Sequence, residues 1–337
     1  MGQLLSHPVE DKTIEGNSHD TFTYGIGSMQ GYRMTMEDAH HVRINQDELL
    51  AVFGVFDGHG GKSVAEYISK HLTREIFKKL NSNRQPDMKL SDYMVIIKDC
   101  FFKIDQELFE IGNYDNCGST AIIATIIDKK YIIVANTGDS RCILSLNGGI
   151  PKTLSFDHKP ILMNERLRVE NSNGYIMNNR INEILALSRA FGDFKFKIPV
   201  IDSTSNKYII QNKKFFKQGL INLPPELFQV SVEPDFLIYD FEVQLLPEFL
   251  VIACDGIWDC YKNNVLINII RNKLSLGWKV NKIIEFILHD CLTMANNYTG
   301  IGFDNMTLVI VAIHPNSDID SWYDSIKNKV LREKNLD

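Results

Sequence analysis

Residues 51–61 read AVFGVFDGHGG, an apolar run that ends at Asp57 and is followed by a glycine-rich turn containing His59. Short runs rich in Val and Phe and bounded by Gly or Asp are typical of buried strands. After the turn, apolar residues recur every fourth position from Val64 to Leu80, as in an amphipathic helix. The stretch therefore predicts a buried strand, a tight turn and a helix, with a carboxylate at the end of the strand.

Three further aspartates stand at the ends of apolar runs. Asp139 follows Tyr131–Ala135 after a short turn, Asp255 follows the run FLVIAC, and Asp304 directly precedes the run NMTLVIVA. A carboxylate at such a position stays charged only if something pairs with it. If the strands share a sheet or lie in facing sheets, the four carboxylates can converge. Hard divalent cations relieve the repulsion that follows.

Glu37 and Asp38 extend this set, because they follow the segment YRMTM that contains Arg33. Carboxylates without a nearby Cys/His pair favour Mg²⁺ or Mn²⁺ over Zn²⁺. Any one such aspartate, taken alone, is most often a turn or cap residue. His59 alone would be a structural histidine, but its place beside Asp57 favours a catalytic acid or base. Arg33, four residues before Glu37, suits phosphate binding.

The rest of the chain alternates short strands with paired helices. We expect strands at Phe22–Ser28, Ala121–Ile127, Tyr131–Ala135, Cys142–Ser145, Phe236–Tyr239, Phe249–Cys254 and Asn305–Ile313. We expect helices at Ser91–Ile111, Val265–Leu274, Val280–Ala295 and Trp322–Leu331, and a short helix leading into a loop at 162–174. Ser63 and Glu66 have the spacing of a capping box, and 128–130 that of a hairpin turn. Residues up to about Asp20 are polar and expected to be loosely ordered. This order favours antiparallel sheets covered by helices, an α+β fold.

The composition is that of a globular protein: 337 residues, 44% hydrophobic, with a formal net charge of −6. This charge argues against general nucleic-acid binding. The six cysteines form no CxxC pair and are expected to be buried and reduced. No apolar run reaches the roughly 18 residues that a membrane span needs. We expect one large domain, a monomer, located in the cytoplasm with a fraction at membranes or in the nucleus.

The first residues, MGQLLS, fit the pattern for myristoylation of Gly2. One myristoyl chain binds membranes only weakly, and no polybasic patch follows it here. We expect residues 1–21 to form an arm that carries this site, 22–315 to form the main domain, and 316–337 to form a short tail or helix.

The combination of motifs resembles metal-dependent Ser/Thr protein phosphatases of the 2C type, and most closely their fungal members. The motifs occur in the same order as in that family: RMTMED at 33–38, DGHGG at 57–61, GST at 118–120, GDSR at 138–141, DHKP at 157–160, LSRAFGD at 187–193, CDGIWD at 254–259 and DNM at 304–306. The match runs from about Gly25 to Ile313. Each motif alone is short, but the combination is specific.

The resemblance implies a sandwich of two antiparallel sheets flanked by pairs of helices, four layers in all, with two metal ions at one end. It implies that Asp57 bridges the metals, that Gly58 offers its carbonyl, and that Asp255 and Asp304 are ligands. Glu37 and Asp38 would act directly or through waters, and Asp139 and Asp259 match a weaker third site. Arg33 would bind the substrate phosphate, and His59 would protonate the leaving alkoxide. A metal-bridging water would attack phosphoserine or phosphothreonine directly.

The sequence departs from that family's pattern in two places. Ser172-Asn173-Gly174 stands where a glycine pair is common, although Asn tolerates a left-handed turn. The segment between Asp193 and Glu233 is longer than in compact relatives. With the family's flap, it covers about residues 162–228. The part from Phe194 to Phe228 holds six lysines against two acids, Asp202 and Glu226. It is expected to be either a solvated loop or a docking surface for acidic phosphoproteins.

Three functions remain open from the sequence. The first is an active phosphoprotein phosphatase that acts in signalling. The second is an inactive relative that serves as a binding module, which the presence of every expected carboxylate disfavours. The third is a metallohydrolase of small phosphates or nucleotides, for which no base or ribose contacts are evident.

Overall fold

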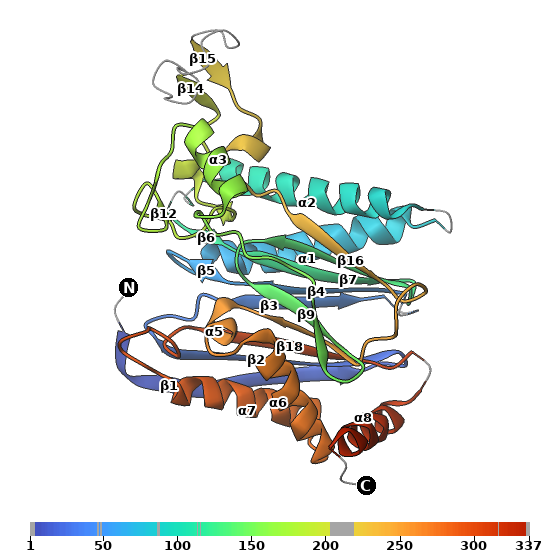
Figure 1. Ribbon diagram of the computed structural model, residues 1–337. Helices are drawn as coiled ribbons and strands as arrows, with labels where there is room; N and C mark the ends of the chain where they lie inside the picture. The colour runs from blue at the N-terminus through green and yellow to red at the C-terminus, as the bar shows by residue number, and fades with distance from the viewer. Residues whose placement is uncertain are drawn as a thin grey trace.

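The computed structural model describes residues 4–45, 47, 49–85, 88–112, 114, 116–202, 219–315 and 317–334. Two antiparallel sheets face each other, and helices cover the outer face of each (Figure 1). Fold, layers and strand direction agree with the α+β sandwich that the sequence predicts. Among the described residues, no helix is long and apolar enough to cross a membrane.

The six-stranded sheet combines segments from the beginning, middle and end of the chain. Its order is β1 (Leu4–Ser18), β2 (Phe22–Arg33), β18 (Met306–Ile313), β17 (Phe249–Ala253), β9 (Arg141–Leu146) and β10 (Ile150–Thr153). Three helices lie on its outer side: α6 (Asn263–Ser275), α7 (Val280–Thr293) and α8 (Ile319–Glu333) (Figure 1). Gly25 and Gly27 in β2 leave room for α7, because a Cβ at either position would overlap Ile284.

The five-stranded sheet has the order β16 (Asp235–Asp240), β8 (Tyr131–Thr137), β7 (Ala121–Ile127), β4 (Leu50–Phe56) and β3 (Ala39–Ile44). Its outer side packs against α1 (Ser63–Asn83) and α2 (Leu90–Ile111). The predicted hairpin turn joins β7 to β8, and both Asp128 and Lys129 take a φ of 54°. Left-handed angles at two successive positions match the twist of paired strands.

The run AVFGVF is apolar at every position because both faces of β4 are buried. Val52 and Phe56 pack under α1 and α2, whereas Ala51, Phe53 and Val55 point into the space between the two sheets. Side chains alternate across a strand, so each sheet supplies one face to this central core and one to its helices. The core holds the strand ends in fixed positions.

Two local predictions are wrong. Residues 4–18 are not loosely ordered but form β1, whose backbone pairs with β2. Most side chains of β1 are exposed, so the backbone hydrogen bonds to β2, rather than apolar burial, hold it in place. The capping box is absent: α1 starts at Ser63, Lys62 occupies the N-cap, and no side chain caps it.

The described parts of the segment 162–228, residues 162–202 and 219–228, extend to one end of the sandwich (Figure 1). It contains α3 (Met163–Asn171) and two short hairpins: β11 (Ile176–Met177) with β12 (Arg180–Ile181), and β14 (Val200–Asp202) with β15 (Leu220–Asn222). Asn173 takes a φ of 64°, so it supports the left-handed turn in place of a glycine.

The basic segment is only partly available as a surface. Lys197 is buried and paired with Asp105, so it cannot contribute to docking. Lys195 is exposed. Lys207, Lys213, Lys214 and Lys217 lie outside the described residues, and so does Gly2.

Candidate metal centre

A cavity of about 700 Å³ opens at the end of the sandwich where several strands terminate. Five predicted carboxylates line it: Glu37, Asp57, Asp139, Asp255 and Asp304. Four of them stand at strand ends, because Asp57 follows β4, Asp139 follows β8, Asp255 follows β17 and Asp304 precedes β18. The facing sheets therefore bring together carboxylates that lie far apart in the sequence.

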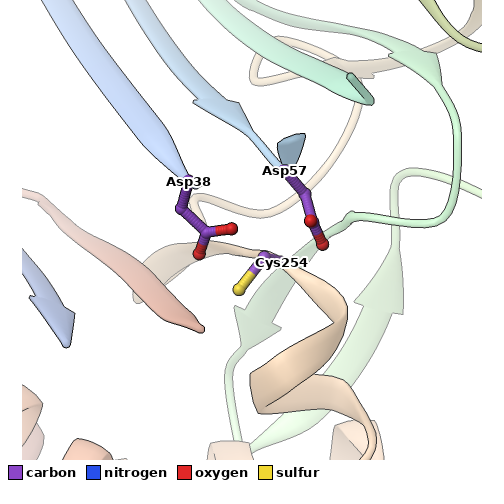
Figure 2. A group of neighbouring side chains, drawn as sticks. All are labelled: Asp38, Asp57 and Cys254. Carbon is purple, nitrogen blue, oxygen red and sulfur yellow. The ribbon is translucent and has the colours of Figure 1, made fainter. Parts of the chain in front are cut away.

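Asp38 lies beside Asp57 (Figure 2), although it is not among the residues that line the cavity. Ligand atoms of Asp38, Asp57 and Cys254 all lie within 4.8 Å of one another. The carboxylate of Asp38 accepts a hydrogen bond from Thr307 Oγ1 at 2.7 Å, which orients it. The sulfur of Cys254 accepts one from the backbone N–H of Thr307 at 3.1 Å.

Cys254 is a neighbour of the site that the sequence did not reveal as such. Burial, with the nearby charges of Asp38 and Asp57, raises the pKa of its thiol well above the ordinary value. The group is therefore a neutral thiol, and hard cations prefer oxygen. Its place directly before Asp255 was the only available sequence signal.

The electrostatics of the site fit a divalent cation. Burial, followed by repulsion from neighbouring carboxylates, raises the pKa values of Asp57 and Asp255 well above the ordinary range. The pKa of Asp38 is raised to about 7, chiefly by burial. Buried carboxylates that oppose one another's ionisation are the donor set that a hard dication stabilises.

Two cationic side chains already balance part of this charge. Arg33 Nη2 lies 2.5 Å from Asp304 Oδ2, and Lys159 is paired with Asp139. Arg33 also lines the cavity, and its side chain is 38% exposed. Lys159 was not among the predicted site residues, although its motif DHKP was noted. Its approach to Asp139 depends on tertiary contact alone.

His59 and Gly58 are held in a turn beside Asp57. His59 Nε2 lies 2.7 Å from Asp193 Oδ2, a contact not predicted from sequence. A Cβ at position 58 would overlap the carbonyl oxygen of Glu37, so only glycine allows this approach. Glu37 in turn accepts a hydrogen bond from the N–H of Gly61 at 3.2 Å.

Comparison with known proteins identifies the family to which this chain belongs. The family model described as protein phosphatase 2C matches residues 22–299. The chain belongs to the protein phosphatase 2C family. Protein phosphatase 2C homolog 4 of Saccharomyces cerevisiae is 37% identical, with all of both chains covered. Protein phosphatase 2C homolog 3 of Schizosaccharomyces pombe is 34% identical over 98% of this chain and 74% of that protein.

Solved structures support the same fold. A phosphatase from Toxoplasma gondii aligns with a TM-score of 0.70 at 22% identity, covering 92% of this chain and 97% of that one. A serine-threonine phosphatase 2C from the same organism aligns with a TM-score of 0.67 at 19% identity, covering 90% and 99%. The fungal relatives agree with the resemblance seen in the motifs. As a phosphatase 2C, the chain is a metal-dependent serine/threonine protein phosphatase.

Not every predicted site residue of this phosphatase 2C lines the cavity. Neither Asp38 nor Asp259 is among the residues that line it. Asp259 lies further along the chain. It follows α5 (Asp255–Trp258), and its N–H donates to the carbonyl of Asp255 at 2.7 Å. Burial raises its pKa, and Asp139 contributes through its charge. A role for Asp139 and Asp259 at a third metal stays a prediction.

Proposed function

We propose that this phosphatase hydrolyses phosphoserine and phosphothreonine in phosphoproteins with Mg²⁺ or Mn²⁺, two ions per chain and a third at a weaker site. Further parts of the proposal are that it acts in signalling, as a monomer, in the cytoplasm. The observation that carries the proposal is the convergence of carboxylates from four strand ends, with Arg33, on one cavity.

The residues that would hold the ions are Asp57, Asp255 and Asp304, with Glu37, Asp38 and the carbonyl of Gly58 completing the set. Bound ions of this kind lower the pKa of a water to make a nucleophile and neutralise charge on the phosphoryl group. Phosphate monoester hydrolysis is among the slowest uncatalysed reactions, so the site must supply a large stabilisation. Oxygen ligands in this number suit Mg²⁺ and Mn²⁺.

Arg33 would bind the substrate phosphate. Its Nη2 is held by Asp304, and its planar guanidinium can present further donors to phosphate oxygens in the cavity. Burial opposes the charge of Arg33, but Asp304, Asp255 and Asp57 together raise its pKa, so the side chain stays cationic. His59, on the cavity wall, would donate a proton to the leaving oxygen.

Removal of metal tests this proposal. Excess chelator should abolish phosphate release from a phosphothreonine peptide, and dialysis into Mn²⁺ or Mg²⁺ should restore it. A panel of phosphopeptides, phosphoproteins and nucleotides would separate a protein phosphatase from a small-phosphate hydrolase. Robust turnover in chelator, or turnover of nucleotides alone, would contradict the proposal.

We further propose that Gly2 is myristoylated. The motif MGQLLS supports this, and Leu4 pairs with Arg33, so the chain enters the fold at the metal end of the sandwich. A single acyl chain should give weak and reversible membrane association. Gly2→Ala should move the protein to the soluble fraction without a change in turnover. Intact mass of protein isolated from its own cells would decide, since the unmodified mass contradicts acylation.

A further inference from the structure

His59 lies in a small three-stranded sheet that joins three separate motifs. Its strands are β13 (Phe191–Gly192), β6 (Gly118–Ser119) and β5 (Gly58–His59). The register aligns His59 with Gly118, and Gly118 with Gly192. The residue after β13 is Asp193, the last member of LSRAFGD, a motif to which the proposed function assigns no role.

The carboxylate of Asp193 is aimed at the imidazole of His59. Asp193 Oδ2 lies 2.7 Å from His59 Nε2, and the Asp193 side chain is about one-twentieth exposed. An ionised carboxylate only accepts hydrogen bonds, so Nε2 donates. Nδ1 of His59 has no hydrogen-bond partner in the described part of the chain, and the ring lines the cavity. Nδ1 is therefore the nitrogen left for a ligand.

Asp193 is itself held firmly. It takes a left-handed conformation, with φ of 52°, and its N–H donates to the carbonyl of Cys117 at 2.9 Å. Asp105 on α2 accepts from the N–H of Gly192 at 2.9 Å and from buried Lys197 Nζ at 2.6 Å. A non-glycine residue in this conformation is uncommon and persists where surrounding contacts impose it.

We propose that Asp193 is a positioning residue for catalysis, which holds His59 so that Nδ1 faces the leaving oxygen of the substrate. The inference rests on the proposed function, because it gives His59 the role of proton donor. The Nδ1 proton passes to the leaving oxygen as its bond to phosphorus breaks and the bonding pair stays with that oxygen. The ring is left neutral and regains its proton from water once the alcohol departs. A carboxylate that fixes the orientation and tautomer of a histidine serves such transfers.

The test compares two substrates, because proton donation matters most for a poor leaving group. Asp193→Asn should lower kcat on a phosphoserine peptide by about 10²-fold, the order expected for a small misplacement of a catalytic group. The loss on an aryl phosphate, whose leaving group is a weak base, should be clearly smaller. In a His59→Gln background, Asp193→Asn should cost almost nothing more on the peptide, because two residues that act as a unit are non-additive.

Gly118→Ala provides a second variant that removes neither partner. A Cβ at Gly118 would overlap both Asp193 Oδ2 and His59 Nε2, and the φ of Gly118 is not positive, so its backbone accepts alanine. The methyl group should separate the pair and reproduce the substrate-dependent loss. Asp240→Asn, at the opposite end of β16 from Asp235, is the matched control and should leave both activities unchanged.

Thermal unfolding and Mn²⁺ titration calorimetry on every variant show whether the fold and metal site persist. Equal losses on both substrates, or additive losses in the double variant, would overturn the role of Asp193 while the phosphatase function stands. A gain in activity for Asp193→Asn would also overturn it, since Asp193 would then be withholding His59. Failure of the unaltered protein to hydrolyse either substrate would instead refute the proposed function, and the positioning role with it.

Discussion

At the residue scale, this protein places several aspartates together at strand ends, positions where a single aspartate is most often a turn residue. Asp57 and Asp255 each follow a fully buried strand, and both are flanked by other carboxylates. Burial and mutual repulsion oppose the ionisation of both groups, so the arrangement weakens the fold unless a cation binds. A site of this kind lowers the stability of the metal-free protein and binds a metal ion more strongly.

Asp57→Asn should remove the central charge of the site. We expect activity to fall by several orders of magnitude, because an amide cannot stabilise a dication as a carboxylate does. The fold should persist, and metal-free protein should become slightly more stable because one repulsive charge is lost. Calorimetric Mn²⁺ titration and thermal unfolding measure the two effects. Unchanged Mn²⁺ affinity would exclude Asp57 as a ligand.

His59→Gln should reduce hydrolysis of a phosphoserine peptide by roughly 10²–10⁴-fold, the usual contribution of general acid catalysis. The same change should cost much less on an aryl phosphate. Steady-state kinetics on the two substrates, with Mn²⁺ saturating, give the comparison. Equal losses would assign His59 a structural role.

At the element scale, α3 is attached to the rest of the fold by charged groups as well as by the buried Val169. Two of the three apolar side chains of the helix, Met163 and Leu167, are exposed, and only Val169 is buried. Glu165, by contrast, is buried and contacts Arg168 at 2.8 Å and Arg189 at 2.7 Å. Arg189 also reaches Asp235 on β16 at 2.8 Å. The network therefore links the helix to the five-stranded sheet.

Loss of the Glu165 charge should release α3 locally. Burial opposes the ionisation of Glu165, but the two arginines outweigh it and lower its pKa from 4.5 to about 2. Its stabilising contribution is thus complete above about pH 4.5 and is lost as the pH falls toward 2. Glu165→Gln should destabilise by about 3 kcal/mol, because both arginines lose their buried partner.

Hydrogen exchange is the measurement that checks this prediction. Amides of residues 163–171 should exchange faster in Glu165→Gln, while β4 and β17 stay protected. Glu66→Gln is a matched control: its ion pair with Lys62 is more than half exposed and should contribute little. Unchanged exchange in α3 would show that apolar contacts hold the helix.

At the scale of the whole molecule, the sandwich fixes the positions of the site residues at one of its ends. Its strands run through a common apolar core, and the chain returns to the same end from β2, β4, β17 and β18. Because both sheets are closely packed, a side chain at one strand end is fixed relative to the others. The stability of the molecule and the charge of the site are thereby coupled.

This coupling predicts a pH-dependent gain from metal. The folded pKa of Asp38, about 7, lies above its ordinary 3.8, so the folded state holds more protons across this window. Raising the pH from about 4 to 7 should therefore lower the stability of the metal-free protein through this group. Bound metal offsets the loss, by about 3 kcal/mol at a hundredfold excess over Kd.

Thermal unfolding at pH 5.5 and pH 8, with and without Mn²⁺, measures the effect. The rise in Tm with Mn²⁺ should be larger at pH 8, where the carboxylates are ionised and metal does not compete with protons. An equal rise at both values would show that these carboxylates do not bind the ion.

The sequence alone determined the class of fold, most strands and helices, and five of the carboxylates that line the cavity. Strands such as β4 and β17 were predictable because burial on both faces makes every position apolar, and α1 and α2 because their apolar residues repeat along one face. β1 was not, because its hydrogen bonds to β2 leave no apolar pattern behind.

Only the tertiary structure decided which side chains meet. The pairing of His59 with Asp193, of Lys159 with Asp139 and of Glu165 with Arg189 joins residues from separate segments of the chain. Local sequence patterns show which face of a helix or strand is buried, but they contain no information about distances between segments. The same packing of sheets and helices places Cys254 among the carboxylates. It also buries Lys197, although this residue belongs to a basic segment.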